Sequence, residues 1–443
     1  MRSTPICDFV KAYAASRPAR FHMPGHKGAA ILGCEALDIT EIDGAGSLYD
    51  AAGIITESEA NASRLFGAQT YYSAEGCSLA IRAMLALALD GADGERPLVL
   101  AGRNAHRAFV SAAALLDFDV AWLAPRDGDA YHSGIVDAAD VDAALARLGG
   151  RCRAVYLTSP DYLGHVADIA AVAEMCRRRG ALLLVDNAHG AYLRFLSPSR
   201  HPMDLGADLC CDSAHKTLPA LTGAAYLHVS PRLGIAPARA KAALALFGSS
   251  SPSWLILQSL DACNRLLEDF PARLAAFLPA LDALKDALRD RGWTLVGDEP
   301  MKLTLAARPF GWTGDKLADA LAAQGVVCEF HDPDYVVLMP SPYSGEDDLR
   351  RLSDALLSIP RRAPIMDAAP RCRVPEAALS IREATFAPRE TLPVRQCAGR
   401  ILAAPALCCP PCVPVAVCGE VIDSDAIERL LYYGFETCEV VKA

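Results

Sequence analysis

The sequence predicts an α/β protein whose largest part is a mostly parallel sheet covered by helices. Between about residues 58 and 216, short strands that are apolar throughout alternate with helical segments, as expected of strands buried on both faces. Polar side chains follow the ends of several of these strands, which is where open α/β sheets bind ligands. At 443 residues the chain also exceeds one ordinary core, so several packed units are expected.

Residues 1–35 are predicted to form an N-terminal helix and arm. Apolar residues recur at helical spacing from Ile6 to Tyr13, and the helix should end before Pro18. The arm continues with Phe-His-Met-Pro-Gly-His-Lys-Gly over 21–28, a proline- and glycine-fixed turn. Its His and Lys side chains suit contact with an anion, although many such turns are plain surface loops.

Residues 36–250 are predicted to form the large unit. In chain order we expect a helix over 79–89, a strand over 97–100, a helix over 105–116, a strand over 120–123, a helix over 137–148, a strand over 154–158, a helix over 169–179, and strands over 181–186 and 207–211. The segment 73–78 opens the first of these helices. Backbone N–H groups and the dipole at a helix start favour a phosphate, although most Ser/Gly starts are simple N-caps.

Two smaller units are predicted after the large one. Residues 251–360 should form a small α/β unit with a helical stretch over 254–288, strands over 294–296, 302–305, 326–330 and 335–339, and helices over 313–324 and 347–357. Residues 360–370 are rich in Pro, Arg and Ala and are typical of a linker. The remainder of 361–443 is a C-terminal unit dense in Pro and Cys.

The composition narrows the class of partner. A formal net charge of -10 argues against nucleic-acid binding, which requires a basic face, so small molecules are the expected partners. We expect a soluble, cytoplasmic protein, because the N-terminus lacks a cleavable hydrophobic segment and no run reaches about 18 uncharged apolar residues. The 16 cysteines are scattered along the chain, which fits reduced thiols in a reducing compartment.

Lys216 is the residue around which the candidate site is organised. It lies in Asp-Ser-Ala-His-Lys-Thr-Leu-Pro over 212–219, directly after an apolar strand, and we expect it on a loop at that strand's end. A lysine in such a setting can form an imine with a carbonyl cofactor, although an ordinary surface lysine is the alternative. Asp186 ends the strand over 181–186, where it could hold a protonated ring nitrogen or simply cap the next helix.

Several motifs together resemble the Orn/Lys/Arg decarboxylase family of fold-type I pyridoxal-phosphate enzymes. The resemblance runs in order through nearly the whole chain and rests on these segments: 21–28, 38–41, 103–107, 158–160, Val-Asp-Asn-Ala-His-Gly over 185–190, Ser-Ala-His-Lys-Thr-Leu-Pro over 213–219, 381–388, 410–414 and Cys-Gly-Glu over 418–420. It implies a short form of the family, without an N-terminal wing domain, that binds pyridoxal 5′-phosphate.

The resemblance also implies roles for individual residues. Lys216 would form the Schiff base, Asp186 would pair with the pyridinium nitrogen and His106 would stack on the ring. The remaining expected cofactor contacts are Ser213, His215, Ala188, Ser159 and the loop residues Ala74, Glu75 and Gly76. Lys216, His215 and His189 are the candidates for returning a proton to the substrate. Glu420, Asp43 and Glu41 are the acidic candidates for the far end of a basic substrate, although each could equally be a cap or a surface charge.

The sequence departs from the family pattern at several positions. Ala74-Glu75 replaces a common Ser-Thr pair in the phosphate loop, and a carboxylate there would repel a phosphate unless Glu75 points away or is neutral. Gly46 and Tyr49 stand where an aspartate and a histidine are common, and Asp161 and Asn187 where a threonine and a glutamate are common. These changes leave the cofactor chemistry intact and leave the substrate open.

The implied reaction is α-decarboxylation of lysine, ornithine or arginine to a polyamine or its precursor, by a homodimer or a multiple of one. The alternatives are another pyridoxal-phosphate reaction, by an aminotransferase or a lyase, and a catalytically silent relative that acts as a partner protein. A C-x-x-C spacing over 409–412 raises the question of a zinc site. No second such pair and no paired histidines complete a site, so no metal is expected.

Overall fold

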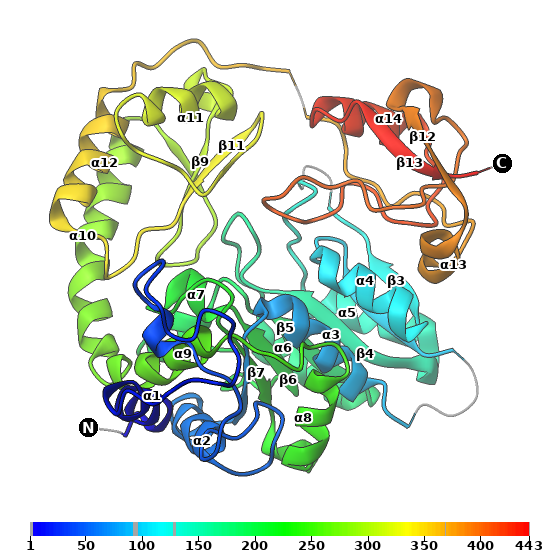
Figure 1. The fold of residues 1–443 in the computed structure, drawn as a ribbon. Helices are drawn as coiled ribbons and strands as arrows, with labels where there is room; N and C mark the ends of the chain where they lie inside the picture. The colour runs from blue at the N-terminus through cyan, green and yellow to red at the C-terminus, as the bar shows by residue number, and fades with distance from the viewer. Residues whose placement is uncertain (1–2, 92–95, 127–129, 368, 443) are drawn as a thin grey trace. The chain divides into compact units, whose positions relative to one another are not determined.

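The computed structural model describes residues 3–91, 96–126, 130–367 and 369–442. Its main feature is a seven-stranded sheet with the order β1-β7-β6-β5-β4-β2-β3 (Figure 1). The strands are β1 (Gln69–Ser73), β2 (Leu98–Gly102), β3 (Asp119–Leu123), β4 (Cys152–Thr158), β5 (Leu182–Asp186), β6 (Leu209–Asp212) and β7 (Ala225–Val229). The predicted α/β class with a large, mostly parallel sheet is confirmed.

The direction of the strands explains where their polar ends meet. β5 and β6 are parallel, with Asp186 opposite Cys211, and β2 and β3 are also parallel. β7 runs antiparallel to both β6 and β1. β2 and β5 are buried along almost their whole length because they carry Val, Leu and Ala on both faces. The carboxyl ends of β5 and β6 therefore lie at one edge of the sheet.

The first of two compact units comprises Met1–Asp93, Arg153–Val155 and Ile169–Ala272. Helix α1 (Pro5–Ala15) buries Ile6 and Val10 and packs on α2 (Ile54–Phe66) and α9 (Trp254–Leu266). Helix α3 (Gly76–Ala88) packs across β5, β6 and β7. The other helices are α6 (Ile169–Arg179), α7 (Ala214–Thr217) and α8 (Pro237–Ala245). This unit contains the β5 and β6 ends and the start of α3.

The second compact unit comprises Gly94–Cys152, Tyr156–Asp168 and Arg273–Ala443. It includes a four-stranded sheet with the order β10-β11-β9-β8 and a two-stranded sheet of β12 and β13. These strands are β8 (Thr294–Val296), β9 (Leu303–Ala306), β10 (Phe330–His331), β11 (Tyr335–Leu338), β12 (Arg389–Pro393) and β13 (Thr437–Val441). Its helices are α4 (Arg107–Leu116), α5 (Ala138–Leu148), α11 (Gly314–Ala322), α12 (Glu346–Ser358), α13 (Ile381–Phe386) and α14 (Ser424–Tyr432).

The structure corrects two expectations about local structure, for Lys216 and for residues 326–330, and refines a third. Lys216 lies in the single helical turn α7 rather than on a loop, because the Leu218 N–H closes an i→i+4 hydrogen bond to Ala214 at 2.8 Å. The helical stretch over 254–288 is two helices, α9 and α10 (Phe270–Asp290). The expected strand over 326–330 pairs only from Phe330, since Val327 is 87% exposed and lies outside the ladder. Within the described residues, no helix is long and apolar enough to span a membrane.

Candidate active site

Lys216 and His189 form the centre of the candidate site in the first unit. The Lys216 Nζ lies 2.9 Å from the His189 Nε2, so an amine and an imidazole share one hydrogen bond. Lys216 is held by α7, which Ser213 begins directly after β6, and His189 follows the end of β5. His189 is only 4% exposed and Lys216 is half-buried. The pair can therefore exchange a proton at a place largely shielded from water.

Asp186 ends β5 beside two thiols. It is 2% exposed, and its Oδ1 accepts hydrogen bonds from the Ala188 N–H at 3.2 Å and from the Cys211 thiol at 3.7 Å. Cys77, in the first turn of α3, belongs to the same cluster. Burial raises the pKa of Cys211, and Cys77 adds to this, so Cys211 faces the carboxylate as a neutral thiol. A thiol is a weak hydrogen-bond donor, so it leaves the charge of the Asp186 carboxylate available to a cation. A protonated ring nitrogen would be such a cation.

The segment 73–78 leads into α3 as predicted, and the structure shows a hydrogen-bond partner for Glu75. The Glu75 Oε1 accepts a hydrogen bond from the Ser249 N–H at 2.6 Å, so this carboxylate is engaged with a backbone group. Gly76 has φ 71° and donates its N–H to Gly223 O at 2.7 Å, while Ala74 is buried. The following N–H groups of α3 have no partner within the helix. This segment therefore fits a phosphate without the hydroxyl pair common in relatives.

The other first-unit candidates differ in their surroundings. His215 lies in α7, and its Nδ1 donates to Ala224 O at 2.9 Å, which fixes the ring. Ser213 is buried at the start of the same turn. Thr217, next to Lys216, has a buried hydroxyl with no hydrogen-bond partner among the described residues. Glu41 and Asp43 are exposed on the loop before α2, and Glu41 accepts the Thr40 hydroxyl at 2.6 Å.

A buried carboxylate that the sequence analysis missed lies directly before Ser213. The Asp212 Oδ2 accepts from the His201 Nε2 at 2.9 Å and the His228 Nε2 at 3.0 Å, and the Oδ1 accepts from the Asn187 Nδ2 at 2.7 Å. Asp212 and both histidines are 0% exposed. Asn187, one of the departures from the family pattern, therefore links the end of β5 to the end of β6. His201 and His228 share no local motif with Asp212, so sequence reasoning had no signal for this cluster.

Asp212 predicts an acid-side loss of stability. Burial alone would raise its pKa, but the two imidazoles outweigh burial and hold the pKa well below 3.8. Because the folded pKa is lowered, this stabilisation is complete above about pH 4 and is lost as the pH falls toward the folded pKa. We expect Asp212→Asn to lower the free energy of unfolding by roughly 1–3 kcal/mol at pH 7, since an amide N–H would face a donor.

Denaturant unfolding of both proteins from pH 7 down to pH 3 checks this expectation. The difference in free energy of unfolding between wild type and Asp212→Asn should become smaller below about pH 4. Asp43→Asn, which changes an exposed carboxylate, is the control and should leave the unfolding midpoint unchanged. An equal gap at every pH would show that Asp212 is not the titrating group.

His106 and Ser159 follow strands of the second unit. His106 follows β2 and is the N-cap of α4, where its Nδ1 accepts the Ala108 N–H at 3.1 Å. Ser159 directly follows β4, is 2% exposed, and its Oγ accepts the Ala167 N–H at 3.0 Å. Asp161 is buried two residues later and accepts the Ser133 hydroxyl at 2.7 Å and the His165 Nδ1 at 2.9 Å. This departure from the family pattern therefore fixes the chain after β4.

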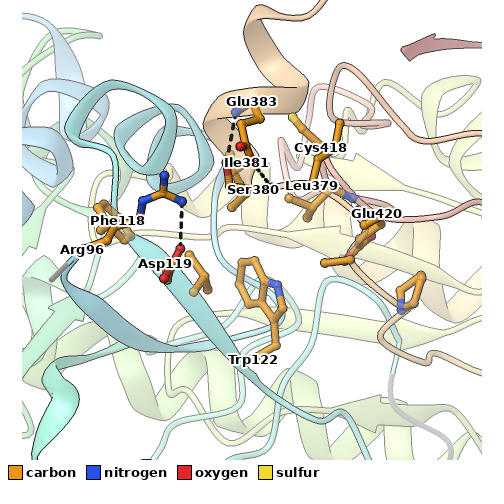
Figure 2. A pocket seen from close by; sticks show the side chains of 15 residues that line it. Arg96, Phe118, Asp119, Trp122, Leu379, Ser380, Ile381, Glu383, Cys418 and Glu420 are labelled. Atoms are coloured by element: carbon orange, nitrogen blue, oxygen red, sulfur yellow. Dashed lines mark hydrogen bonds and ion pairs between the residues drawn. The ribbon is translucent and has the colours of Figure 1, made fainter. Parts of the chain in front are cut away.

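Glu420 lies in a buried ion pair in the second unit. Its carboxylate is 3.0 Å from the Arg103 Nη2, and its Oε2 accepts the Val417 N–H at 2.7 Å. Burial raises the pKa of Glu420, and Arg103 opposes this shift. Glu420 also lines a cavity of about 400 Å³ together with Trp122 and Cys418 (Figure 2). The structure thus assigns this carboxylate a partner within its own chain, while its predicted contact with substrate stays a prediction.

Removing the cation of this pair is expected to destabilise the second unit. Arg103→Met removes the guanidinium that hydrogen-bonds Glu420 and leaves only the attraction of Arg429, which should cost about 3–5 kcal/mol. Adding Glu420→Gln in the same chain removes the stranded charge and should restore part of the loss. Thermal unfolding followed by circular dichroism measures both effects. Equal unfolding temperatures for Arg103→Met and wild type would contradict the buried pair.

Comparisons with known proteins agree with this geometry. The family model described as Orn/Lys/Arg decarboxylase, major domain, matches residues 4–276. An arginine decarboxylase of Bacillus subtilis is 26% identical over 96% of this chain and 93% of its own length. An arginine decarboxylase of Halalkalibacterium halodurans is 28% identical over 95% of this chain and 91% of its own length.

The fold has equally extensive matches among solved structures. The crystal structure of a Francisella novicida lysine decarboxylase superposes with a TM-score of 0.79, covering 99% of this chain and 81% of that chain at 16% identity. At this identity the match supports the fold alone.

Proposed function

Because the chain belongs to the Orn/Lys/Arg decarboxylase family, we propose that it removes the α-carboxyl group of a basic amino acid. The enzymes of this family depend on pyridoxal 5′-phosphate, and this chain is an amino-acid decarboxylase of that kind. The observation that carries the proposal is the Lys216–His189 contact of 2.9 Å at the ends of the strands that also bear Asp186. When bound, the cofactor's protonated ring accepts the electron pair that remains after CO2 leaves.

Different residues of this chain would bind different parts of the cofactor. Lys216 would attach it, Asp186 would hold its ring nitrogen, and His106 would lie on its ring face. Its phosphate would be bound by the start of α3 at 74–76 and by Ser213, with His215, Ala188 and Ser159 around it. The support is that these residues lie at strand ends or helix starts, where donors point out of the fold.

His189 is our first choice for moving a proton. Its Nε2 shares a hydrogen bond with the Lys216 Nζ, so a proton on either group can pass to the other. Lys216 and His215 are the further candidates for delivering the proton to the α-carbon. Glu420, Asp43 and Glu41 are proposed for the distal charge of the substrate, and acidic groups suit a guanidinium or ammonium there.

Arginine, lysine and ornithine are the substrates to test. Curated relatives aligned over nearly their full length are named arginine decarboxylase, so arginine is the first of the three. Purified protein with added cofactor is assayed for CO2 release and for the amine product with each amino acid. Release of CO2 with formation of the amine supports the proposal. Formation of a keto acid without CO2 would instead indicate an aminotransferase.

The setting of the reaction is also a proposal. We infer a homodimer, or a multiple of one, acting in the cytoplasm to supply a polyamine or its precursor. The support is the family membership and the cysteine-rich, acidic composition. Light scattering on a gel-filtration column measures the oligomer, and a monomeric mass at micromolar concentration with full activity would contradict the dimer.

A further inference from the structure

Backbone hydrogen bonds close the loop between Ala406 and Ala416 at its base and at a second place within the loop. The Ala406 N–H donates to Ala416 O at 3.0 Å, and the Val415 N–H donates to Ala406 O at 2.8 Å. Within the loop, the Cys412 N–H donates to Cys408 O at 2.8 Å, which closes a five-residue turn. Three cysteines thus lie on a short segment whose ends are fixed by backbone hydrogen bonds.

Two of these thiols are in contact. The sulfur atoms of Cys409 and Cys412 are 2.7 Å apart, with Cys409 exposed and Cys412 half-buried. Cys412 has φ 58°, a left-handed conformation that few residues other than glycine adopt, and this turns its side chain back toward Cys409. The fold therefore brings the two sulfur atoms together before any bond joins them, so little chain entropy opposes their bonding.

The other neighbouring thiols differ in exposure. Cys77 and Cys211 are buried beside Asp186, and Cys397 and Cys438 are buried in the core of the C-terminal segment. An oxidant dissolved in water reaches the 409–412 pair far more readily than either of these. Reactivity of a thiol toward a disulfide depends on this access as well as on thiolate content.

A metal-binding site explains the contact between Cys409 and Cys412 less well than a dithiol does. Among the described residues, the groups of three metal-ligating side chains are Cys77–Asp186–Cys211 and His201–Cys210–Asp212. The loop 408–412 does not gather three ligand atoms in this way, and a structural zinc ion needs four ligands. The arrangement is that of a dithiol.

We propose that Cys409 and Cys412 form a reversible intramolecular disulfide, a redox modification site on an exposed loop. The oxidant is a low-molecular-weight disulfide. The Cys409 thiolate attacks one of its sulfur atoms and releases one thiol; Cys412 then attacks Cys409 and releases the second. The protein loses two hydrogen atoms, that is two protons and two electrons, and the small disulfide gains them and becomes two thiols.

The loop also contacts the first turn of α4. The Arg107 N–H donates to Cys412 O at 2.8 Å, and Arg107 follows His106 directly. A disulfide that moves Cys412 would therefore act on the helix whose N-cap is His106. This consequence rests on the proposed function, whereas the disulfide itself does not.

The test uses the full chain, reduced and freed of reductant, then incubated with glutathione disulfide. Intact mass spectrometry should show the loss of two hydrogen masses, peptide fragmentation should join Cys409 to Cys412, and dithiothreitol should restore the starting mass. Cys412→Ser should instead retain a stable glutathione adduct on Cys409, and Cys409→Ser should not lose the two hydrogens. Cys408→Ser is the matched control, because it changes the adjacent exposed thiol, and should behave as wild type.

Three results would overturn the proposal. They are an unchanged mass in wild type, a lasting glutathione adduct on Cys409 in wild type, and a disulfide that joins Cys409 or Cys412 to any other cysteine. Each result is read from mass alone, so it is independent of whether the protein decarboxylates an amino acid.

Discussion

Lys216→Ala is expected to abolish covalent attachment of the cofactor and to lower the rate of CO2 release by at least about 1000-fold. Lys216 is the one lysine on the turn that follows β6, and its Nζ already lies 2.9 Å from a buried imidazole. No neighbouring side chain on α7 offers a second amine. Absorbance spectra of the purified protein with added cofactor should show a visible band in wild type that the variant lacks.

A matched lysine separates this effect from a general loss of charge. Lys316 is exposed on α11, so Lys316→Ala should keep the visible band and the activity. Borohydride reduction followed by peptide mapping should locate the cofactor on the peptide that contains Lys216. A visible band that survives in Lys216→Ala would refute its assignment as the attachment site.

Asp186→Asn should produce the second largest loss. The amide keeps the size of the side chain but removes the charge that pairs with a protonated ring nitrogen. Breaking a buried charge pair costs about 3–5 kcal/mol, which corresponds to a fall in rate of about 100-fold or more. We expect weaker cofactor binding as well, measured by fluorescence titration, while Lys216 still attaches the cofactor.

The control for Asp186 is an exposed carboxylate. Asp282→Asn on α10 should change neither the rate nor the cofactor affinity. If Asp186→Asn decarboxylates at the wild-type rate, Asp186 serves only to hold the chain after β5, as its hydrogen bond from the Ala188 N–H would allow.

Sequence reasoning could predict β2, β3, β4, β5 and β6 because each contains a run of apolar residues that is long enough to recognise. β7 was missed although it is buried along its whole length. β1 was missed because Gln-Thr-Tyr-Tyr-Ser is too polar to look like a central strand, and it is stabilised by antiparallel pairing with β7, far along the chain. The strand expected over 326–330 was wrong because, of these residues, only Phe330 pairs with β11, while Val327 is exposed.

The candidate site was predictable where its residues form local motifs. Asp186 ends β5, Lys216 lies on the turn after β6, and each belongs to a recognisable motif, so their neighbourhood followed from the sequence. Asp212 could not be found in this way, because its partners His201 and His228 are brought to it only by the fold, with His228 opposite Cys210 in the β6–β7 ladder.

The buried Asp212 cluster has a consequence for the rigidity of the site. Both histidines donate from Nε2 to Asp212, the His201 Nδ1 accepts the Met203 N–H, and the His228 Nδ1 lies 2.9 Å from the Thr70 hydroxyl. Each ring is thereby held at both of its nitrogen atoms by groups of the fold. Buried hydrogen bonds therefore fix the end of β6 directly before the turn that bears Lys216.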